Sequence, residues 1–198
     1  MQKYLVEFIG TFFLLIAIYI SKDPVTIFAV LTAMIYAGGP ISSAHYNPAV
    51  TIAFWIRGGM SRKDVLPYIL AQVLAIVAAI YTTQLLGGLV ATPSDFEISS
   101  ILIAEILGTF ALVFVILNVA TAKKSEGNTY FGIVIGLVVL GGIYLFGPLS
   151  GAAMNPAVAI ALCWEGSFMW TQIWAYLVAE FVAAIIATLT FLYVNGKE

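Results

Sequence analysis

The tripeptide Asn-Pro-Ala occurs twice in the chain, as Asn47-Pro48-Ala49 and as Asn155-Pro156-Ala157. Each copy lies inside an almost entirely apolar stretch. Asn is a preferred N-cap residue, and Pro in the first helical turn needs no amide partner, so each copy favours the start of a helix. The two copies therefore predict a pair of helices that begin inside apolar surroundings, at matching places in two halves of the chain.

The composition places the chain in a lipid bilayer. Hydrophobic residues make up 62% of its 198 residues, charged residues make up 9%, and the mean hydropathy is +1.05. Soluble domains usually carry about a quarter charged residues. The net charge of −2 gives no indication of nucleic-acid binding, and no motif implies a cofactor or a metal.

Six apolar segments are long enough, or nearly so, to cross a membrane, which takes roughly 20 residues. They cover residues 4–20, 25–41, 65–88, 99–121, 129–147 and 168–194. Two shorter apolar segments, 47–57 and 155–164, follow the Asn-Pro-Ala copies. At 1.5 Å per residue they reach about half of the ~30 Å hydrocarbon layer. We therefore expect an all-α membrane protein with six transmembrane helices and two re-entrant half-helices.

The positive charges predict the orientation, because Lys and Arg gather on the cytoplasmic side of membrane proteins. On one side of a six-span arrangement lie Lys3, Arg57, Arg62, Lys63, Lys123, Lys124 and Lys197. Lys22 alone lies on the other side. We expect a multi-pass protein of the plasma (inner) membrane with both termini in the cytoplasm.

Three blocks of sequence recur in the same order. Residues 7–12 return at 105–110, 47–50 return at 155–158, and 68–72 return at 176–180. The first offset is 98 and the other two are 108, which places an insertion in the second half before its Asn-Pro-Ala. We expect one domain over 1–198, with repeats at about 1–90 and 99–198 and a linker at about 91–98. Three spans in each repeat make the second repeat inverted in the membrane.

On these residues the chain resembles the major intrinsic proteins, the aquaporin and aquaglyceroporin family. The resemblance rests on the two Asn-Pro-Ala boxes, the two Glu-x-x-Gly-Thr-Phe openings and the run Ser43–Thr51. It implies an aquaporin-like fold and a homotetramer with a separate pore in each subunit. It also implies a passive channel that has no cofactor, lies among membrane lipids and takes small neutral solutes.

The resemblance assigns roles to the polar residues of the apolar segments. Asn47 and Asn155 would meet at the middle of the membrane, where two helix amino termini, each with roughly half a positive charge, disfavour cations. The alternative is that both residues only cap helices.

Further buried polar residues would hold the loops in place. Glu7 and Glu105 would accept hydrogen bonds from the re-entrant loops, rather than carry ions. Gln72 and Glu180 occupy equivalent positions and would brace the same loops. His45 would pin the first loop as a neutral imidazole, with a pH gate as the alternative.

The chain departs from the family where the pore is usually narrowest. Directly after the second Asn-Pro-Ala the family usually has Arg, and this chain has Val158. Spacing from the two Asn residues transfers the other three filter positions to Ile27, Ile143 and Ala152. Loss of the Arg removes five donors and a fixed charge, so we expect a wide, apolar selectivity filter. The residue that follows is Ala159, where glycerol channels usually have Asp.

The sequence thus predicts a channel for water and small neutral solutes such as glycerol, urea, ammonia or metalloid acids like undissociated arsenite. A water-selective channel, an ion-conducting channel, a coupled carrier and a structural junction protein are the alternatives. We expect ions to be excluded, but by a lower barrier to cations and protons than a filter with Arg would give. An intramembrane enzyme is not expected, because one His and one Cys without paired acids offer no catalytic set.

Overall fold

The computed structural model describes residues 1–88 and 91–196, and in these residues six helices are long and apolar enough to cross a membrane. The long helices are α1 (Gln2–Ser21), α2 (Pro24–Ser42), α4 (Arg62–Leu85), α5 (Ile98–Thr121), α6 (Phe131–Ser150) and α8 (Ile173–Asn195). The two short helices are α3 (Pro48–Arg57) and α7 (Pro156–Glu165). The prediction of an all-α membrane fold with six spans and two half-helices is confirmed.

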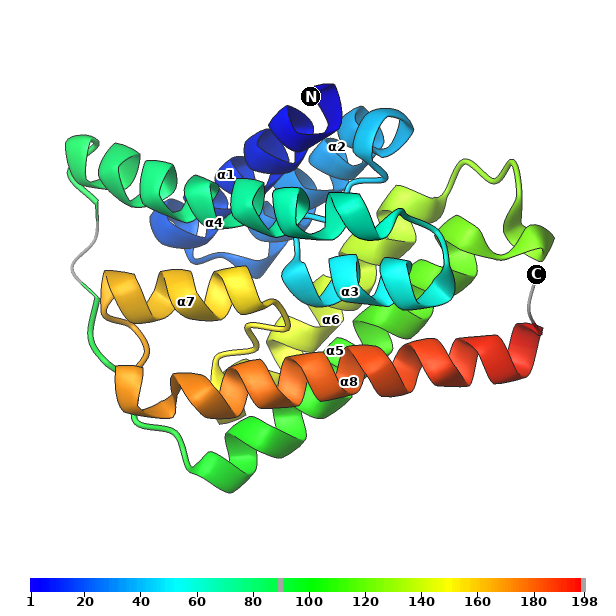
Figure 1. The fold of residues 1–198 in the computed structure, drawn as a ribbon. Helices are drawn as coiled ribbons and strands as arrows, with labels where there is room; N and C mark the ends of the chain where they lie inside the picture. The colour runs from blue at the N-terminus through cyan, green and yellow to red at the C-terminus, as the bar shows by residue number, and fades with distance from the viewer. Residues whose placement is uncertain (89–90, 197–198) are drawn as a thin grey trace.

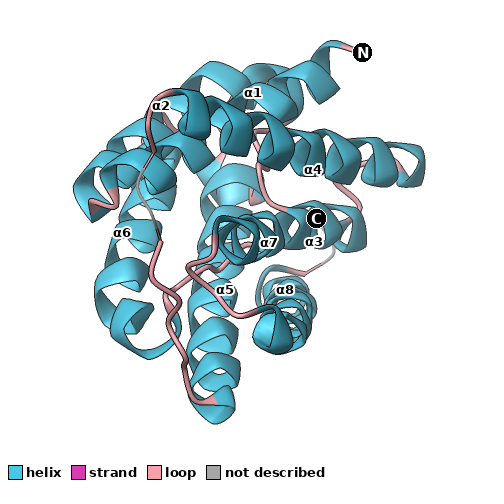
Figure 2. Ribbon diagram, turned by 90° about the vertical axis from the view of Figure 1, so that its left-hand side faces the viewer, coloured by secondary structure: helices cyan, strands magenta, loops and turns pink. Residues whose placement is uncertain are grey.

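The helices surround a centre formed by the two half-helices. Figure 1 shows α3 and α7 lying along one line with their amino termini facing each other. Figure 2, turned by 90°, shows the long helices arranged around them. We call the side where α3 ends, with residues 58–61 and 122–130, the α3 face. The side where α7 ends, with residues 22–23 and 166–172, is the α7 face.

Local sequence signals set the helix ends. Asp23 caps α2, where its carboxylate accepts hydrogen bonds from the Thr26 hydroxyl and amide, both at 2.7 Å. These two bonds hold the pKa of the Asp23 carboxyl below its usual value. Both half-helices stop at a glycine in the left-handed region, Gly58 with φ 87° and Gly166 with φ 99°. Glycine adopts this conformation without a steric cost, so it ends a helix cleanly.

The predicted spans differ from the structure by a few residues at their ends, and two of these differences have a visible local cause. The span predicted at 65–88 ends at Leu85, because Gly87 turns left-handed with φ 74°. The span predicted at 168–194 begins with a single 3₁₀ turn, η2 (Trp170–Gln172), before α8. Gln172 of that turn donates through Nε2 to the Phe96 carbonyl at 2.6 Å, which fastens the linker to it. The predicted end of repeat one at residue 90, and Lys197, lie outside the described residues.

Helix packing follows the internal repeat. In the first half α1 packs against α2 and α4, and in the second half α5 packs equivalently against α6 and α8. Only residues 22–23 connect α1 to α2, whereas residues 122–130, including the 3₁₀ turn η1 (Lys123–Ser125), connect α5 to α6. Most of the inserted residues of the second half therefore lie in this loop on the α3 face.

The small residues of α6 serve packing inside the chain. A Cβ atom built on Gly136 would lie 2.2 Å from the Thr32 hydroxyl of α2, and one on Gly132 would lie 2.8 Å from the Tyr36 ring. The absence of side chains at these two positions lets α6 approach α2 across the boundary between repeats. Both glycines therefore pack against α2 within the chain.

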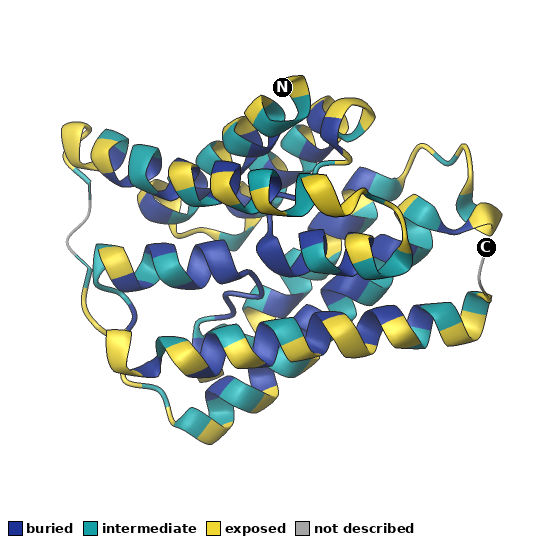
Figure 3. Ribbon diagram, in the orientation of Figure 1, coloured by how far each residue is buried: buried dark blue, intermediate teal, exposed yellow. Residues whose placement is uncertain are grey.

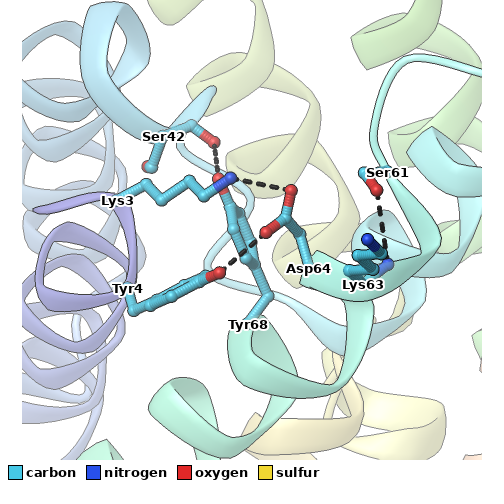
Figure 4. A network of polar contacts seen from close by, with 7 residues as sticks. All are labelled: Lys3, Tyr4, Ser42, Ser61, Lys63, Asp64 and Tyr68. Carbon is cyan, nitrogen blue, oxygen red and sulfur yellow. Dashed lines mark hydrogen bonds and ion pairs between the residues drawn. The ribbon is translucent and has the colours of Figure 1, made fainter. Parts of the chain in front are cut away.

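A polar network ties α1 to α4 on the α3 face (Figure 4). Lys3 forms an ion pair with Asp64 through Nζ and Oδ2 at 2.7 Å, and the Tyr4 hydroxyl donates to Asp64 Oδ1 at 2.7 Å. From α4, Tyr68 donates to the carbonyl of Ser42, the last residue of α2, at 2.9 Å. These contacts fix the entrance to the loop before α3.

The outer surface is apolar, as a bilayer requires. Figure 3 shows exposed residues along the outer sides of the long helices and buried residues at the facing ends of α3 and α7. Three tryptophans near the α7 face, Trp164, Trp170 and Trp174, are each about half exposed. Aromatic residues of this kind gather where a membrane meets water.

Candidate functional site

A cavity of about 840 Å³ is lined by residues of both half-helices, including the Asn residues at their facing ends. Its lining includes Lys22 and Glu165 near the α7 face and Lys123 and Asn128 near the α3 face, so it extends through the width of the molecule. The wall between these ends is mostly apolar and comes from α1, α2, α5, α6 and both half-helices. A cavity of this shape can serve as a path across a membrane.

The half-helices are capped and joined at the middle of the cavity. Asn47 Oδ1 accepts from the Ala49 amide at 2.8 Å, and Asn155 Oδ1 accepts from the Ala157 amide at 3.0 Å. Each Asn also donates through Nδ2 across the repeat boundary, Asn47 to the Met154 carbonyl and Asn155 to the Tyr46 carbonyl, both at 2.9 Å. An amide nitrogen has two N–H groups. One N–H of each Asn therefore remains for the cavity, which both residues line.

The loops before the half-helices repeat the same unusual backbone. Ala44 and Tyr46 adopt φ of 49° and 50°, and the equivalent Ala152 and Met154 adopt φ of 51° and 49°. Residues other than glycine rarely occupy this left-handed region, which costs about 1–3 kcal/mol each and needs support from the surroundings. The loops thus require bonds from elsewhere in the fold.

Two buried carboxylates supply these bonds. Glu7 accepts from the amides of His45 at 2.9 Å and Tyr46 at 2.7 Å. Glu105 accepts from the amides of Ala153 at 2.9 Å and Met154 at 2.7 Å. Each carboxylate also accepts from the last serine of the neighbouring span, Ser42 or Ser150, at 2.7 Å. Both side chains are fully buried, and their oxygens face the loops.

The remaining polar residues brace each loop in a different way. In the first half, Gln72 donates to Glu7 Oε2 at 2.9 Å, and His45 Nδ1 lies 3.2 Å from the Thr51 hydroxyl. The His45 ring is buried and packs against Phe54 at a centroid distance of 4.2 Å. In the second half, Glu180 Oε1 accepts directly from the backbone N–H of Asn155 at 2.9 Å.

The glycine of each Glu-x-x-Gly-Thr-Phe opening makes room for a loop residue. A Cβ atom built on Gly10 would lie 2.1 Å from Cε1 of Tyr46, and one on Gly108 would lie 2.9 Å from Cγ of Met154. The glutamate one turn earlier binds the same loop. The repeated motif therefore combines an acceptor for the loop amides with a space for the loop side chain.

Gly10→Ala is expected to destabilise the protein by about 1–3 kcal/mol, because the new methyl group forces the Tyr46 ring out of its place. Thermal unfolding in detergent measures this loss. Gly141→Ala is the matched control, since a Cβ atom there meets nothing within 4 Å. Equal melting temperatures for the two variants would contradict the close packing of Tyr46 on Gly10.

The four residues transferred by spacing all line the cavity. Ile27 comes from α2, Ile143 from α6, Ala152 from the loop before α7 and Val158 from the first turn of α7. None of these four side chains carries a polar group. Two contacts between the end of α1 and α7, near the α7 face, have no signal in the sequence. The Tyr19 hydroxyl donates to the Ala161 carbonyl at 3.0 Å, and Lys22 pairs with Glu165 at 3.6 Å.

Comparisons with known proteins agree with this geometry. A family model described as "Major intrinsic protein" matches residues 25–191. Aquaporin NIP1-1 of Zea mays is 36% identical over 204 residues, covering 93% of this chain and 71% of that protein. Aquaporin AqpM of Methanothermobacter thermautotrophicus is 34% identical over 182 residues, covering 84% of this chain and 74% of that protein.

A solved structure shares the fold. The aquaglyceroporin from Plasmodium falciparum superimposes with a TM-score of 0.78 and covers 96% of this chain and 94% of that chain. At 21% sequence identity this likeness concerns the fold alone.

Proposed function

The chain belongs to the major intrinsic protein family of aquaporin-type membrane channels, which are not enzymes, and from this premise we propose that it conducts water together with larger neutral solutes. Glycerol, urea, ammonia and metalloid acids such as undissociated arsenite form the solute class. Each is uncharged, and each can exchange hydrogen bonds with the two Asn amides at the centre of the cavity.

The observation that carries the proposal is the apolar lining at Ile27, Ile143, Ala152 and Val158. We assign these residues to the selectivity filter. An Arg at Val158 would fill part of the path and would bind water and solutes through its guanidinium group. Without it, the filter admits solutes that are wider than water.

The polar residues serve the same path in two ways. Asn47 and Asn155 offer one free N–H each to a passing solute, and the converging helix amino termini oppose cations at that level. Glu7, Glu105 and His45 act as the scaffold of the two loops. Their contacts are with loop atoms and neighbouring side chains, which supports this role over ion transport.

We also propose the assembly and orientation of the channel. One domain over 1–198 forms the pore, and four copies assemble into a homotetramer with four separate pores. The α3 face lies in the cytoplasm of a cell whose plasma (inner) membrane holds the protein, because that face carries every described Lys and Arg except Lys22. Both termini then lie in the cytoplasm.

The test is stopped-flow light scattering on proteoliposomes challenged with water, glycerol, urea and arsenite gradients. We expect each solute to cross faster than in protein-free liposomes of the same lipid. Flux of water alone would contradict the wide filter and favour a water-selective channel. Absence of any flux would contradict the channel itself.

A further inference from the structure

A charged pair lines the cavity at the α7 face. Lys22 follows α1 in the first repeat, and Glu165 ends α7 in the second. Lys22 Nζ lies 3.6 Å from Glu165 Oε1, and both residues line the cavity. Each repeat therefore contributes one charge to this mouth.

The two charges are not equally accessible to a solute. The Glu165 side chain is 11% exposed, and its other carboxylate oxygen accepts a hydrogen bond from the Ser167 hydroxyl. The Lys22 side chain is 44% exposed. An ammonium group has three N–H donors, and the carboxylate engages one side of it only. The accessible charge at this mouth is therefore positive.

The position of the pair relative to the filter follows from α7. Glu165 lies seven residues after Val158 on the same helix, which at 1.5 Å per residue is about 10 Å along the helix axis. Among the described residues that line this half of the cavity, Lys22 is the one cation and Glu165 the one anion. The cation thus stands outside an apolar ring that has no charge of its own.

We propose that Lys22 is a specificity-determining residue that rejects cations at the α7 face, and that Glu165 positions it and partly neutralises it. The inference rests on the proposed channel function. The rise of about 10 Å along α7 is comparable to the Debye length, which is about 8 Å at physiological ionic strength and about 10 Å at 0.1 M, so salt reduces the field of the pair at the filter but does not remove it. Lys22 hence supplies electrostatic selection outside the filter, while the filter itself stays wide enough for neutral solutes.

Urea and guanidinium test this inference, because they have nearly the same planar shape and differ by one charge. Urea flux is followed by light scattering, and guanidinium uptake by a radioactive label, in the same proteoliposomes. We expect Lys22→Met to raise the guanidinium-to-urea ratio about three- to tenfold, from Coulomb energies at this separation. Glu165→Gln should lower the ratio, because it leaves the Lys22 charge unopposed.

Two further variants separate selection from a merely structural role. Lys22→Arg keeps the charge and should keep the wild-type ratio. Lys124→Met removes a cation that does not line the cavity, and it should also leave the ratio unchanged.

The two proposals fail in different ways. If wild-type urea flux is normal but Lys22→Met and Glu165→Gln leave the ratio unchanged, or shift it in the same direction, the role of Lys22 is wrong and the channel stands. If Lys22→Met does not fold, Glu165→Gln still tests the role of Lys22. A guanidinium-to-urea ratio for Glu165→Gln at or above the wild-type value would overturn that role. If neither urea nor glycerol crosses in the wild type, the proposed function fails and the inference falls with it.

Discussion

Val158→Arg is expected to reduce urea and glycerol permeability by at least about tenfold, which corresponds to a barrier higher by about 1.4 kcal/mol. Val158 lies in the first turn of α7 and lines the cavity, as Ala152 does. A guanidinium group there narrows the path and adds a fixed positive charge and five donors. The water permeability should fall much less, because water is smaller than urea and glycerol. Stopped-flow light scattering on proteoliposomes measures all three permeabilities.

Val158→Leu is the matched control for size. It enlarges the side chain but adds no charge and no donor, so it should reduce solute flux less than the Arg variant does. Equal losses for Leu and Arg would assign selectivity to width alone. Unchanged urea and glycerol flux in Val158→Arg would show that the narrowest point lies elsewhere in the cavity.

Glu7→Ala is expected to destabilise the protein by about 3 kcal/mol or more and to abolish solute flux. Four buried donors lose their acceptor: the Ser42 hydroxyl, the His45 and Tyr46 amides and the Gln72 side chain. The first loop, with its left-handed residues, then loses the two bonds from its amides to Glu7. Thermal unfolding in detergent and flux in proteoliposomes measure the two effects.

Glu7→Gln distinguishes an acceptor role from the need for a side chain of that size. Its amide keeps one oxygen but places an N–H₂ group against donors, so we expect an intermediate loss of stability. Glu97→Gln is the control, because Glu97 is exposed and its side chain makes no cap hydrogen bond. If Glu7→Gln were as stable as Glu97→Gln, the loop would not depend on the carboxylate.

Much of the fold could be predicted from the sequence because membrane spans and half-helix starts have local signals. Length and hydropathy predict the spans, and Asn before Pro marks the first turns of α3 and α7. The repeat predicts that Glu7 and Glu105 are equivalent. The prediction fails at span ends where a tertiary contact decides, as at Gln172, whose side chain binds the linker. Hydropathy contains no information about such a bond.

The site was less predictable because its contacts join distant parts of the chain. The bond between the Asn47 side chain and the Met154 carbonyl spans 107 residues and depends on how the two repeats meet. The pair of Lys22 and Glu165 also depends on how the two repeats meet, and neither residue belongs to a motif. Spacing did suffice for Ile27 and Ile143, which line the cavity; their role in the filter stays a prediction.

The bonds between the two caps have a consequence for how the protein is made. The first half-helix, α3, packs against α8, the last helix among the described residues, and its capping Asn binds the loop before α7. A ribosome must therefore complete α8 before all contacts of the first re-entrant segment can form. Until then the polar loop before α3 lacks its partners from the second repeat. A chain truncated between the repeats therefore cannot form half of the channel by itself.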